Sequence, residues 1–145
     1  MKTHVITPET GKHETFNDEK IVDFLYTHLD QYGDEKEDIQ KCIDYVFTPG
    51  RGGAIYLAEE DSSIVGAVIV NHTGMHGYIP ENILVYIAVH QNQRGKGTGK
   101  ALMQLVTDHC KGDIALHVEK DNPAKFLYEK FGFTNPYLEM RLKRS

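Results

Sequence analysis

The residues from Gln91 to Lys100, QNQRGKGTGK, combine three glycines with three cations in one short turn. The turn follows an apolar run and comes directly before a segment with helical periodicity. The first amides of a helix have no internal acceptor, and the helix dipole places partial positive charge there. Glycines let such amides approach a phosphate closely, and Arg94, Lys96 and Lys100 add formal charge. The sequence therefore predicts a phosphate-binding turn.

Two common nucleotide-binding motifs do not fit this turn. A Walker motif requires G-x-x-x-x-G-K-[ST], but Arg94 stands at the first glycine position and Ala101 follows Lys100. A Rossmann turn requires a third glycine where Lys100 stands, and no full βαβ pattern precedes it. A net charge of −5 and a pI of about 5.9 disfavour a general nucleic-acid binder. ATP, NAD and nucleic acid are therefore disfavoured ligands.

Length and composition predict one domain over residues 1–145. The chain is large enough to bury a core, and its apolar fraction of 40% is ordinary for a soluble globular protein. No apolar stretch approaches the roughly 18 residues that span a bilayer, and the N-terminus does not resemble a signal peptide. The two cysteines form no C-x-x-C pair, and no metal-binding motif occurs. We expect a cytoplasmic protein without membrane partners or metal.

Apolar periodicity predicts the elements that hold the turn. The order is helix, helix, three strands, helix, strand, helix, strand, with a short strand near the N-terminus, which indicates a mixed α/β (α+β) sheet. The expected helices are 21–32, 34–47, 98–111 and 123–130, and the expected strands are 4–7, 54–60, 64–70, 83–90, 114–118 and 137–143.

Two segments carry a family resemblance. The spacing Arg94-x-x-Gly97-x-Gly99 resembles the [QR]-x-x-G-x-[GA] signature of the GNAT superfamily of N-acetyltransferases. Downstream, HVEKDNPAKFLYEKFGF resembles the family's second signature, a strand followed by Asn, a short helix carrying Tyr, and a Gly-Phe turn. The resemblance extends from about residue 18 onward. It implies a mostly antiparallel sheet with flanking helices and acetyl-CoA in the splay between the fourth and fifth strands.

The resemblance also implies a set of cofactor-binding residues. Backbone groups of the strand end would contact the pantetheine arm and the acetyl carbonyl, and the turn would hold the pyrophosphate. Asn122, Lys125 and Tyr128 would line the cofactor arm, although Asn122 before Pro123 is also a good helix cap. The strand-end residues are Ile87, Ala88 and Val89, and the turn residues are Arg94, Gly95, Lys96, Gly97, Thr98, Gly99 and Lys100.

Tyr128 falls where many family members carry a tyrosine beside the cofactor sulfur. The thiolate that leaves when an amine attacks a thioester has a conjugate pKa of roughly 8.5, and a phenol near 10 stays protonated to serve it. The resemblance therefore implies that Tyr128 is the catalytic acid. The alternative is a tyrosine of the core beside Phe126 and Phe131.

The base is less sharply indicated. Glu81 lies just before the fourth strand, near where some family members place a glutamate, and it is the predicted base. A solvated acid at a strand edge is the alternative. His72, His76 and His90 lie near the same region and remain alternative bases.

These residues together predict an acetyl-CoA-dependent N-acetyltransferase that transfers acetyl directly in a ternary complex. The acceptor would be a primary amine of a small molecule or a peptide, and the acidic run 34–38 could attract a cationic one. The resemblance also allows a homodimer, because dimers are common in the family. The alternative is a non-catalytic acyl-CoA-binding sensor or regulatory module.

Overall fold

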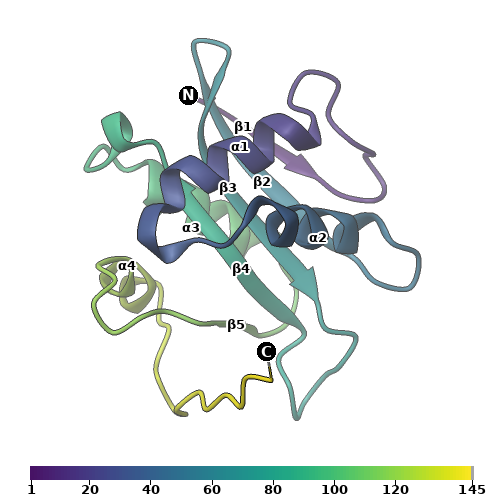
Figure 1. Cartoon of the computed structure of the whole chain (residues 1–145), viewed down its shortest axis with the longest axis vertical. Coiled ribbons are helices and arrows are strands. Elements are labelled where there is room, and N and C mark those ends of the chain that lie inside the picture. Colours follow the sequence, from purple (N-terminus) through teal and green to yellow (C-terminus); the bar gives the residue numbers. More distant parts are fainter. Residues whose placement is uncertain (145) are drawn as a thin grey trace.

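A five-stranded sheet forms the middle layer of the computed structural model, which describes residues 1–144 (Figure 1). Its strands lie side by side in chain order. Pairings up to β4 are antiparallel, and β4 pairs with β5 in parallel. The predicted mixed and mostly antiparallel sheet is confirmed. The strands are β1 (Lys2–Ile6), β2 (Gly53–Glu60), β3 (Ser63–His72), β4 (Asn82–Val89) and β5 (Ile114–Leu116).

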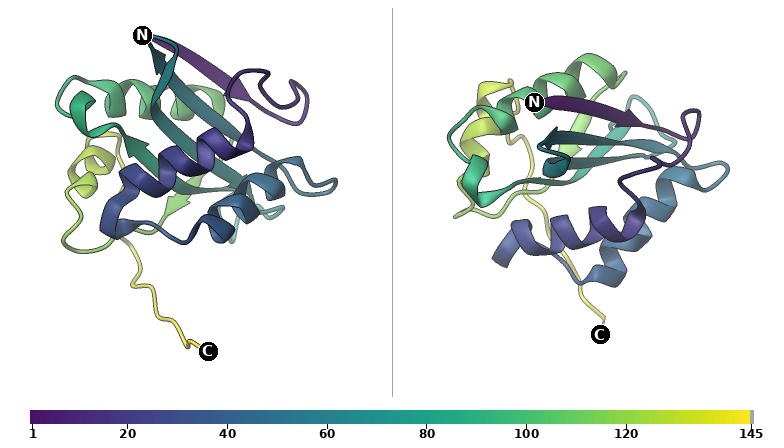
Figure 2. Two further views of the ribbon diagram at one scale, coloured as in Figure 1. Left: turned by 45° about the horizontal axis from the view of Figure 1, so that its top comes forward. Right: turned by 90° about the horizontal axis from the view of Figure 1, so that it is seen from above.

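Helices cover both faces of the sheet (Figure 2). One face carries α1 (Asp18–Leu29) and α2 (Lys36–Phe47), and the other carries α3 (Thr98–His109) with α4 (Ala124–Lys130) beside it. Two short 3₁₀ turns, η1 (Asp30–Tyr32) and η2 (Gln91–Gln93), connect elements. Within residues 1–144, no helix is long and apolar enough to cross a membrane.

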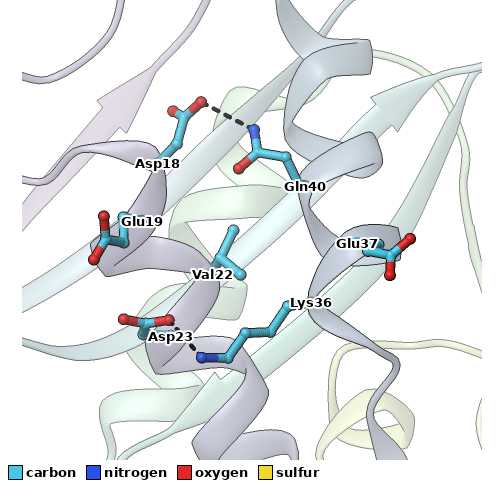
Figure 3. Close-up of a pocket in the computed structure, with 7 residues that line it drawn as sticks. All are labelled: Asp18, Glu19, Val22, Asp23, Lys36, Glu37 and Gln40. Atoms are coloured by element: carbon cyan, nitrogen blue, oxygen red, sulfur yellow. Dashed lines mark hydrogen bonds and ion pairs between the residues drawn. The ribbon is translucent and has the colours of Figure 1, made fainter.

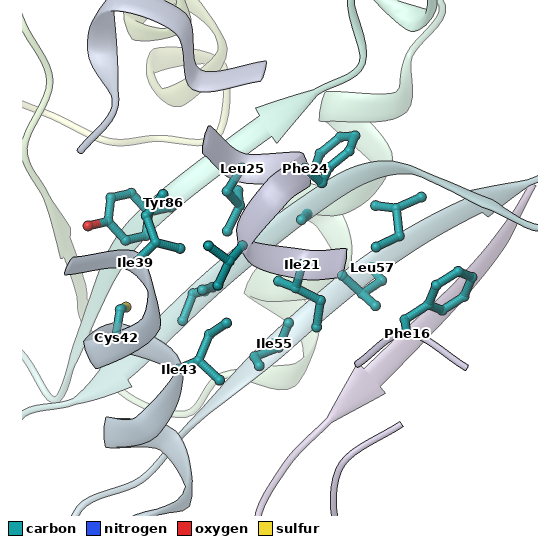
Figure 4. Packing of buried hydrophobic residues seen from close by; sticks show 14 of the residues in the cluster. Phe16, Ile21, Phe24, Leu25, Ile39, Cys42, Ile43, Ile55, Leu57 and Tyr86 are labelled. Atoms are coloured by element: carbon teal, nitrogen blue, oxygen red, sulfur yellow. The ribbon is translucent and has the colours of Figure 1, made fainter. Parts of the chain in front are cut away.

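Two apolar cores hold these layers together. Alternate residues of the central strands point to opposite faces, so β2 and β3 are apolar on both sides. Ile55, Leu57 and Ile69 pack with α1 and α2 (Figure 4), whereas Tyr56 and Val68 pack on the α3 side. Burial on both faces explains why these strands are continuous apolar runs in the sequence.

β4 and β5 stay paired for only three residues. Residues 82–84 face residues 114–116, after which β5 ends and β4 continues. The pairing of β4 with β3 also shifts between Ile69 and Val70, which leaves Val85 as the extra residue of a β-bulge. Bulges bend a strand and increase its twist. The two strands therefore separate toward their carboxyl ends.

The predicted C-terminal strand is wrong. Residues 137–143 form no strand, although Leu138, Met140 and Leu142 alternate with polar residues. These three side chains are 76–92% exposed. Alternation specifies which face of a strand would be apolar, but a strand forms only where an edge pairs with it.

Asp34 and Glu37 have the spacing of a capping box in the sequence, but the structure contradicts this prediction. The helix begins at Lys36 with Glu35 as N-cap, and no side chain caps it. The Asp34 carboxylate instead accepts a hydrogen bond of 2.6 Å from the Tyr86 hydroxyl. A bond to a carboxylate in a partly buried site is stronger than a bond to an exposed amide.

Several predicted boundaries differ by a few residues. The first helix ends at Leu29 rather than residue 32, because the chain tightens into η1. The strand predicted over 114–118 ends at Leu116. Asp61-Ser62-Ser63, between two apolar runs, predicts a hairpin, and the structure confirms it, with Asp61 and Ser62 both at positive φ between β2 and β3.

Candidate active site

Five unpaired amides lie at the glycine turn. Among the described residues, these amides donate to no protein acceptor, while the next amide in the helix, that of Ala101, donates to the Gly97 carbonyl. Four of them belong to the N-cap and first turn of α3, where helix geometry supplies no acceptor. The five are Gly95, Gly97, Thr98, Gly99 and Lys100. We call these five free amides the anion cradle, after the ligand that the sequence predicts for this turn.

Backbone conformation and close packing fix the cradle. Gly95 and Gly97 have φ of 79° and 84°, a region that side chains disfavour. A Cβ on Gly99 would lie 3.3 Å from Leu127 of α4 and 3.6 Å from Val89 of β4. The glycine therefore lets α3, α4 and the end of β4 meet, which brings the helix of Tyr128 to the cradle.

The Arg94 side chain is engaged by the protein rather than free for a ligand. Its Nη2 donates to the His28 carbonyl at 3.0 Å and its Nε donates to the Val89 carbonyl at 3.4 Å. Its amide donates to the Gln91 carbonyl. The bond to His28 connects the end of α1 to the glycine turn. The positive charge of Arg94 also stabilises α1, because the C-terminus of a helix carries partial negative charge. Lys96 and Lys100 are exposed and remain available for phosphate.

His28 lies beside this tie. Its ring is 4.3 Å from that of His90 and 4.6 Å from that of Phe24. Its Nδ1 is buried and has no hydrogen-bond partner within residues 1–144. Burial, together with the nearby His90 and Arg94, lowers the pKa of His28.

Tyr128 is buried on α4, with 6% of its surface exposed. Burial, reinforced by Glu119, raises its pKa to about 12, so the hydroxyl holds its proton at neutral pH. The hydroxyl has no protein hydrogen-bond partner in the described part of the chain, and it is not fully enclosed. It is therefore a donor without an acceptor. Its ring belongs to the core on the α3 side, which includes Phe131 as the alternative interpretation predicts, but not Phe126, which is 68% exposed.

Asn122 caps α4, because its Oδ1 accepts from the Ala124 amide at 2.9 Å. Its Nδ2 donates to Glu119 at 3.2 Å, so both ends of the side chain have protein partners. Lys125 is exposed on the same helix. Capping, one of the two predicted roles of Asn122, is confirmed, and cofactor contact by either residue stays a prediction.

Ile87, Ala88 and Val89 lie on the part of β4 that has lost β5. In an antiparallel strand, every second residue directs its backbone groups away from the paired neighbour. Here those groups face the gap between β4 and β5. Val85, whose bulge bends β4 at this gap, cannot be found from the sequence, because a bulge inside an apolar β-branched run leaves no composition signal.

Glu81 lies at the opposite end of β4 from the cradle, about 26 Å away at 3.3 Å per residue. Its carboxylate rests against Gly112 in the turn between α3 and β5. His72 and His76 lie at that same end and are exposed, whereas His90 lies at the glycine turn. The structure thus does not bring Glu81 next to the cradle, and its role as the base stays a prediction.

An acidic hollow of about 630 Å³ lies on the connection between α1 and α2. Asp34, in its wall, accepts the bond from Tyr86, the first residue of β4 after the bulge. The hollow therefore adjoins the point at which β4 and β5 separate. Its lining residues are Tyr26, Thr27, Asp30, Gly33, Asp34, Glu35 and Asp38.

A second hollow of about 620 Å³ lies between α1 and α2 (Figure 3). Here Asp23 pairs with Lys36 at 2.9 Å, and Asp18 accepts from Gln40 at 3.0 Å. Asp18 and Asp23 are therefore paired, and Lys36 adds a positive charge to this hollow. Among the described residues, no cation lines the hollow beside Tyr86, so that hollow is the better candidate for a cationic ligand.

Charge is divided between the two sides of the molecule. Residues 18–47 carry nine acidic and three basic side chains, a net charge of −6, so the rest of the chain carries +1. The electrostatic potential is therefore positive near the cations of the cradle and negative at the acidic hollow. The arrangement suits an anionic ligand at the glycine turn and a cationic one at the helix pair.

One comparison decides the family. Residues 51–135 match the sequence model described as the acetyltransferase (GNAT) domain, which is more than half of the chain. The chain belongs to the GNAT acetyltransferase family. A solved ribosomal-protein-alanine N-acetyltransferase from Brucella melitensis biovar Abortus 2308 shares the fold, with a TM-score of 0.69 at 15% identity over 99% of this chain and 100% of that one.

Two curated proteins match parts of this GNAT chain. The 5-NmdU N-acetyltransferase of Pseudomonas phage PaMx11 is 33% identical over 86 residues, 57% of this chain and 58% of its own length. The mouse cysteine-rich protein 2-binding protein is 37% identical over 54 residues, 37% of this chain and 7% of its own. This chain therefore spans less than two thirds of either relative.

The lowered pKa of His28 makes the stability of this GNAT domain depend on pH. Above about pH 6.5, His28 is neutral in both the folded and unfolded states. As pH falls below about 6.5, the unfolded state takes up the proton before the folded state does, so the free energy of unfolding decreases until the pH has passed below the lower folded pKa. His28→Gln should flatten this acidic part of the profile, as measured by urea unfolding across the pH range.

His76→Gln, in an exposed loop, is the matched control and should keep the natural profile. An equal acidic decrease in the natural chain and in His28→Gln would contradict the assignment.

Proposed function

We propose that this protein is an acetyl-CoA-dependent N-acetyltransferase that transfers acetyl to a primary amine by direct transfer within a ternary complex. The observation that carries the proposal is the anion cradle, which follows the part of β4 that no longer pairs with β5. Five free amides and two exposed lysines fit a pyrophosphate, and the open edge of β4 fits an extended arm. No other part of residues 1–144 combines these features.

Acetyl-CoA supplies an activated acyl thioester and releases a thiol. The cradle would hold its pyrophosphate, while Ile87, Ala88 and Val89 would orient the arm through backbone groups. Lys96 and Lys100 would add charge at the same place. The Arg94 side chain would act by positioning the turn rather than by contacting phosphate, because both of its bonds go to carbonyls.

Tyr128 would protonate the leaving sulfur. Its raised pKa keeps the proton available, and its hydroxyl lacks a competing protein acceptor within the described residues. The close packing of α4 against α3 at Gly99 supports this role, because it brings the helix that carries Tyr128 beside the cradle.

Glu81 is retained as the proposed base. An alkyl amine with a pKa near 10.4 is mostly protonated at neutral pH, so a proton must leave it. Glu81 lies next to the part of β4 that is still paired with β5, four residues or about 13 Å along the strand from the bulge, so ordered water would have to relay the proton.

A cationic amine is the proposed class of acceptor. The acidic hollow beside Tyr86 supports it through charge and through its place next to the strand separation. The name of the phage relative, a 5-NmdU N-acetyltransferase, supports a nitrogen acceptor without specifying this one. Small molecules and peptides both carry such amines.

The proposal extends to the whole chain. One continuous sheet from β1 to β5 supports a single domain over residues 1–145. Cys42 and Cys110 are both free, which supports a reducing compartment such as the cytoplasm.

The first test is release of free thiol from acetyl-CoA in the presence of a panel of primary amines. Amine-dependent release supports the proposal. Saturable acetyl-CoA binding without release for any amine of the panel would favour the sensor module instead.

Tyr128→Phe should lower turnover by roughly 10- to 1000-fold with little change in acetyl-CoA affinity, because it removes only the donor. Turnover is measured by thiol release and affinity by calorimetry. The control is Tyr45→Phe. It removes a hydroxyl on α2 that donates to the His72 carbonyl, and it should retain turnover. Near-normal turnover of Tyr128→Phe would exclude the acid role.

Glu81→Gln should remove the acidic limb of the pH–rate profile if Glu81 takes the amine proton. The measurement is kcat across pH with a saturating amine. A profile that keeps its shape in the variant would exclude Glu81 and direct the search to His90.

The double substitution Asp30→Asn with Asp38→Asn should raise KM for a cationic amine by roughly 3- to 10-fold, because it removes charge from the acidic hollow. KM for acetyl-CoA should not change. Asp23→Asn with Glu37→Gln removes the same charge from the second hollow and serves as the control. Equal increases in both double variants would contradict a specific acceptor site.

A further inference from the structure

The first half of β4 exposes two large apolar side chains although the strand lies inside the sheet, between β3 and β5. Ile83 and Val85 are each 37% exposed, and within residues 1–144 neither belongs to one of the two apolar cores. The side chains of such an inner strand are usually covered by helices. These two are open to a ligand instead.

The register of the sheet places Ile83 on the face that carries α1 and α2. Ile83 lies opposite Asn71 of β3, and opposite residues of antiparallel strands share a face. Asn71 is on the α2 side, because its Nδ2 donates to the Cys42 carbonyl at 3.2 Å. On β5, the residue in register with Ile83 is Ala115, whose single methyl group cannot cover it.

The loop before β4 adds further apolar surface at the same end of the strand. Thr73 closes this loop, because its amide donates to the Glu81 carbonyl at 2.9 Å. Met75 and Ile79 lie within the loop and are 44% and 40% exposed. Exposed apolar surface that is contiguous rather than scattered usually marks a binding site. We call these two residues, with Ile83 and Val85, the apolar strip.

Tyr86 connects the apolar strip to the acidic hollow. Its ring packs in the core with Leu25 and Ile39 (Figure 4), and its hydroxyl donates to the Asp34 carboxylate at 2.6 Å. Ile83 precedes Tyr86 by three residues, which is about 10 Å along the strand. A ligand whose ammonium group binds beside Asp34 can therefore reach the strip with its other end.

The strip itself offers nothing to a second cation. Each of its four side chains is a hydrocarbon or a thioether, and a charge placed on such a surface loses hydration without gaining a partner. Glu81, two residues before Ile83, directs its carboxylate toward Gly112 in the turn before β5. The charge that favours a cation is thus confined to the hollow at one end.

We propose that the acceptor is a small amphipathic monoamine, whose primary ammonium binds beside Asp34 and whose hydrocarbon group packs on the apolar strip. This acceptor class rests on the proposed acetyltransferase function and narrows it. The ammonium group then lies next to the bulge, where β4 and β5 separate, and the hydrocarbon group extends away from the gap.

The test compares pentylamine with cadaverine, which has the same carbon chain and a second ammonium group. The Kd of each is measured by ligand-observed NMR titration of the full chain in the presence of CoA, which carries no acetyl group. We expect pentylamine to bind roughly 10-fold more tightly, because the second charge of cadaverine would lie on the strip. Equal affinities, tighter binding of cadaverine, or no binding of millimolar pentylamine would overturn the proposal.

The double variant Ile83→Thr with Val85→Thr should weaken pentylamine binding by roughly 3- to 10-fold, because it replaces apolar contact surface with hydroxyls. Thr is β-branched and suits a strand, and an unchanged acetyl-CoA shift in thermal unfolding checks that the variant is folded. The control is Val5→Thr in β1, at the opposite edge of the sheet, and it should bind as the natural chain does. Pentylamine binding that is unchanged in the folded double variant contradicts the strip.

Thiol release from acetyl-CoA separates this acceptor class from the proposed function. Tighter binding of pentylamine together with release supports both. Tighter binding without release supports the amine site and contradicts acetyltransfer. Release with a lower KM for cadaverine, or for a lysine-containing peptide, supports the enzyme and overturns the monoamine. Pentylamine binding that weakens as protein concentration rises would show that a second copy covers the strip, which also overturns it.

Discussion

The arrangement of the candidate site follows from the early separation of β4 from β5, which pair over only three residues. The backbone N–H and C=O groups of a strand are unfavourable when neither a partner nor solvent reaches them. After residue 84, however, β4 no longer pairs with β5 on that side. The bulge at Val85 makes the bend, and the carboxyl ends of both strands then lead to the two turns that carry the candidate residues. The gap is part of the fold rather than a disordered strand end, because β4 remains paired with β3 as far as Val89.

Tight packing keeps the cradle at the mouth of that opening. A Cβ on Gly66 would lie 2.6 Å from Leu102 and 3.2 Å from Thr98, so α3 rests directly on β3 at its first turn. Gly99 allows the same closeness to α4, and Arg94 ties in the end of α1. Elements from both faces of the sheet thus fix the direction of the free amides.

Local sequence patterns are sufficient to predict the glycine turn and the order of helices and strands. They do not predict contacts between segments that are distant in the chain. The glycines and cations of residues 94–100 act through their own backbone, so their spacing predicted the cradle. Asp34 looked like a helix cap because its partner, Tyr86, is 52 residues away. Val85 was hidden in a uniform apolar run, and the alternation after Pro136 described a strand face without specifying an edge to receive it.

The most direct measurement is thermal unfolding of the natural chain with acetyl-CoA and, in parallel, with acetyl-pantetheine, which lacks the pyrophosphate. A ligand at about 100 times its Kd adds about 2.7 kcal/mol to the free energy of unfolding, which moves the midpoint by several degrees. We expect a saturable increase of the midpoint with acetyl-CoA and a much smaller increase with acetyl-pantetheine. Equal shifts with both ligands, or no shift with millimolar acetyl-CoA, would contradict the anion cradle.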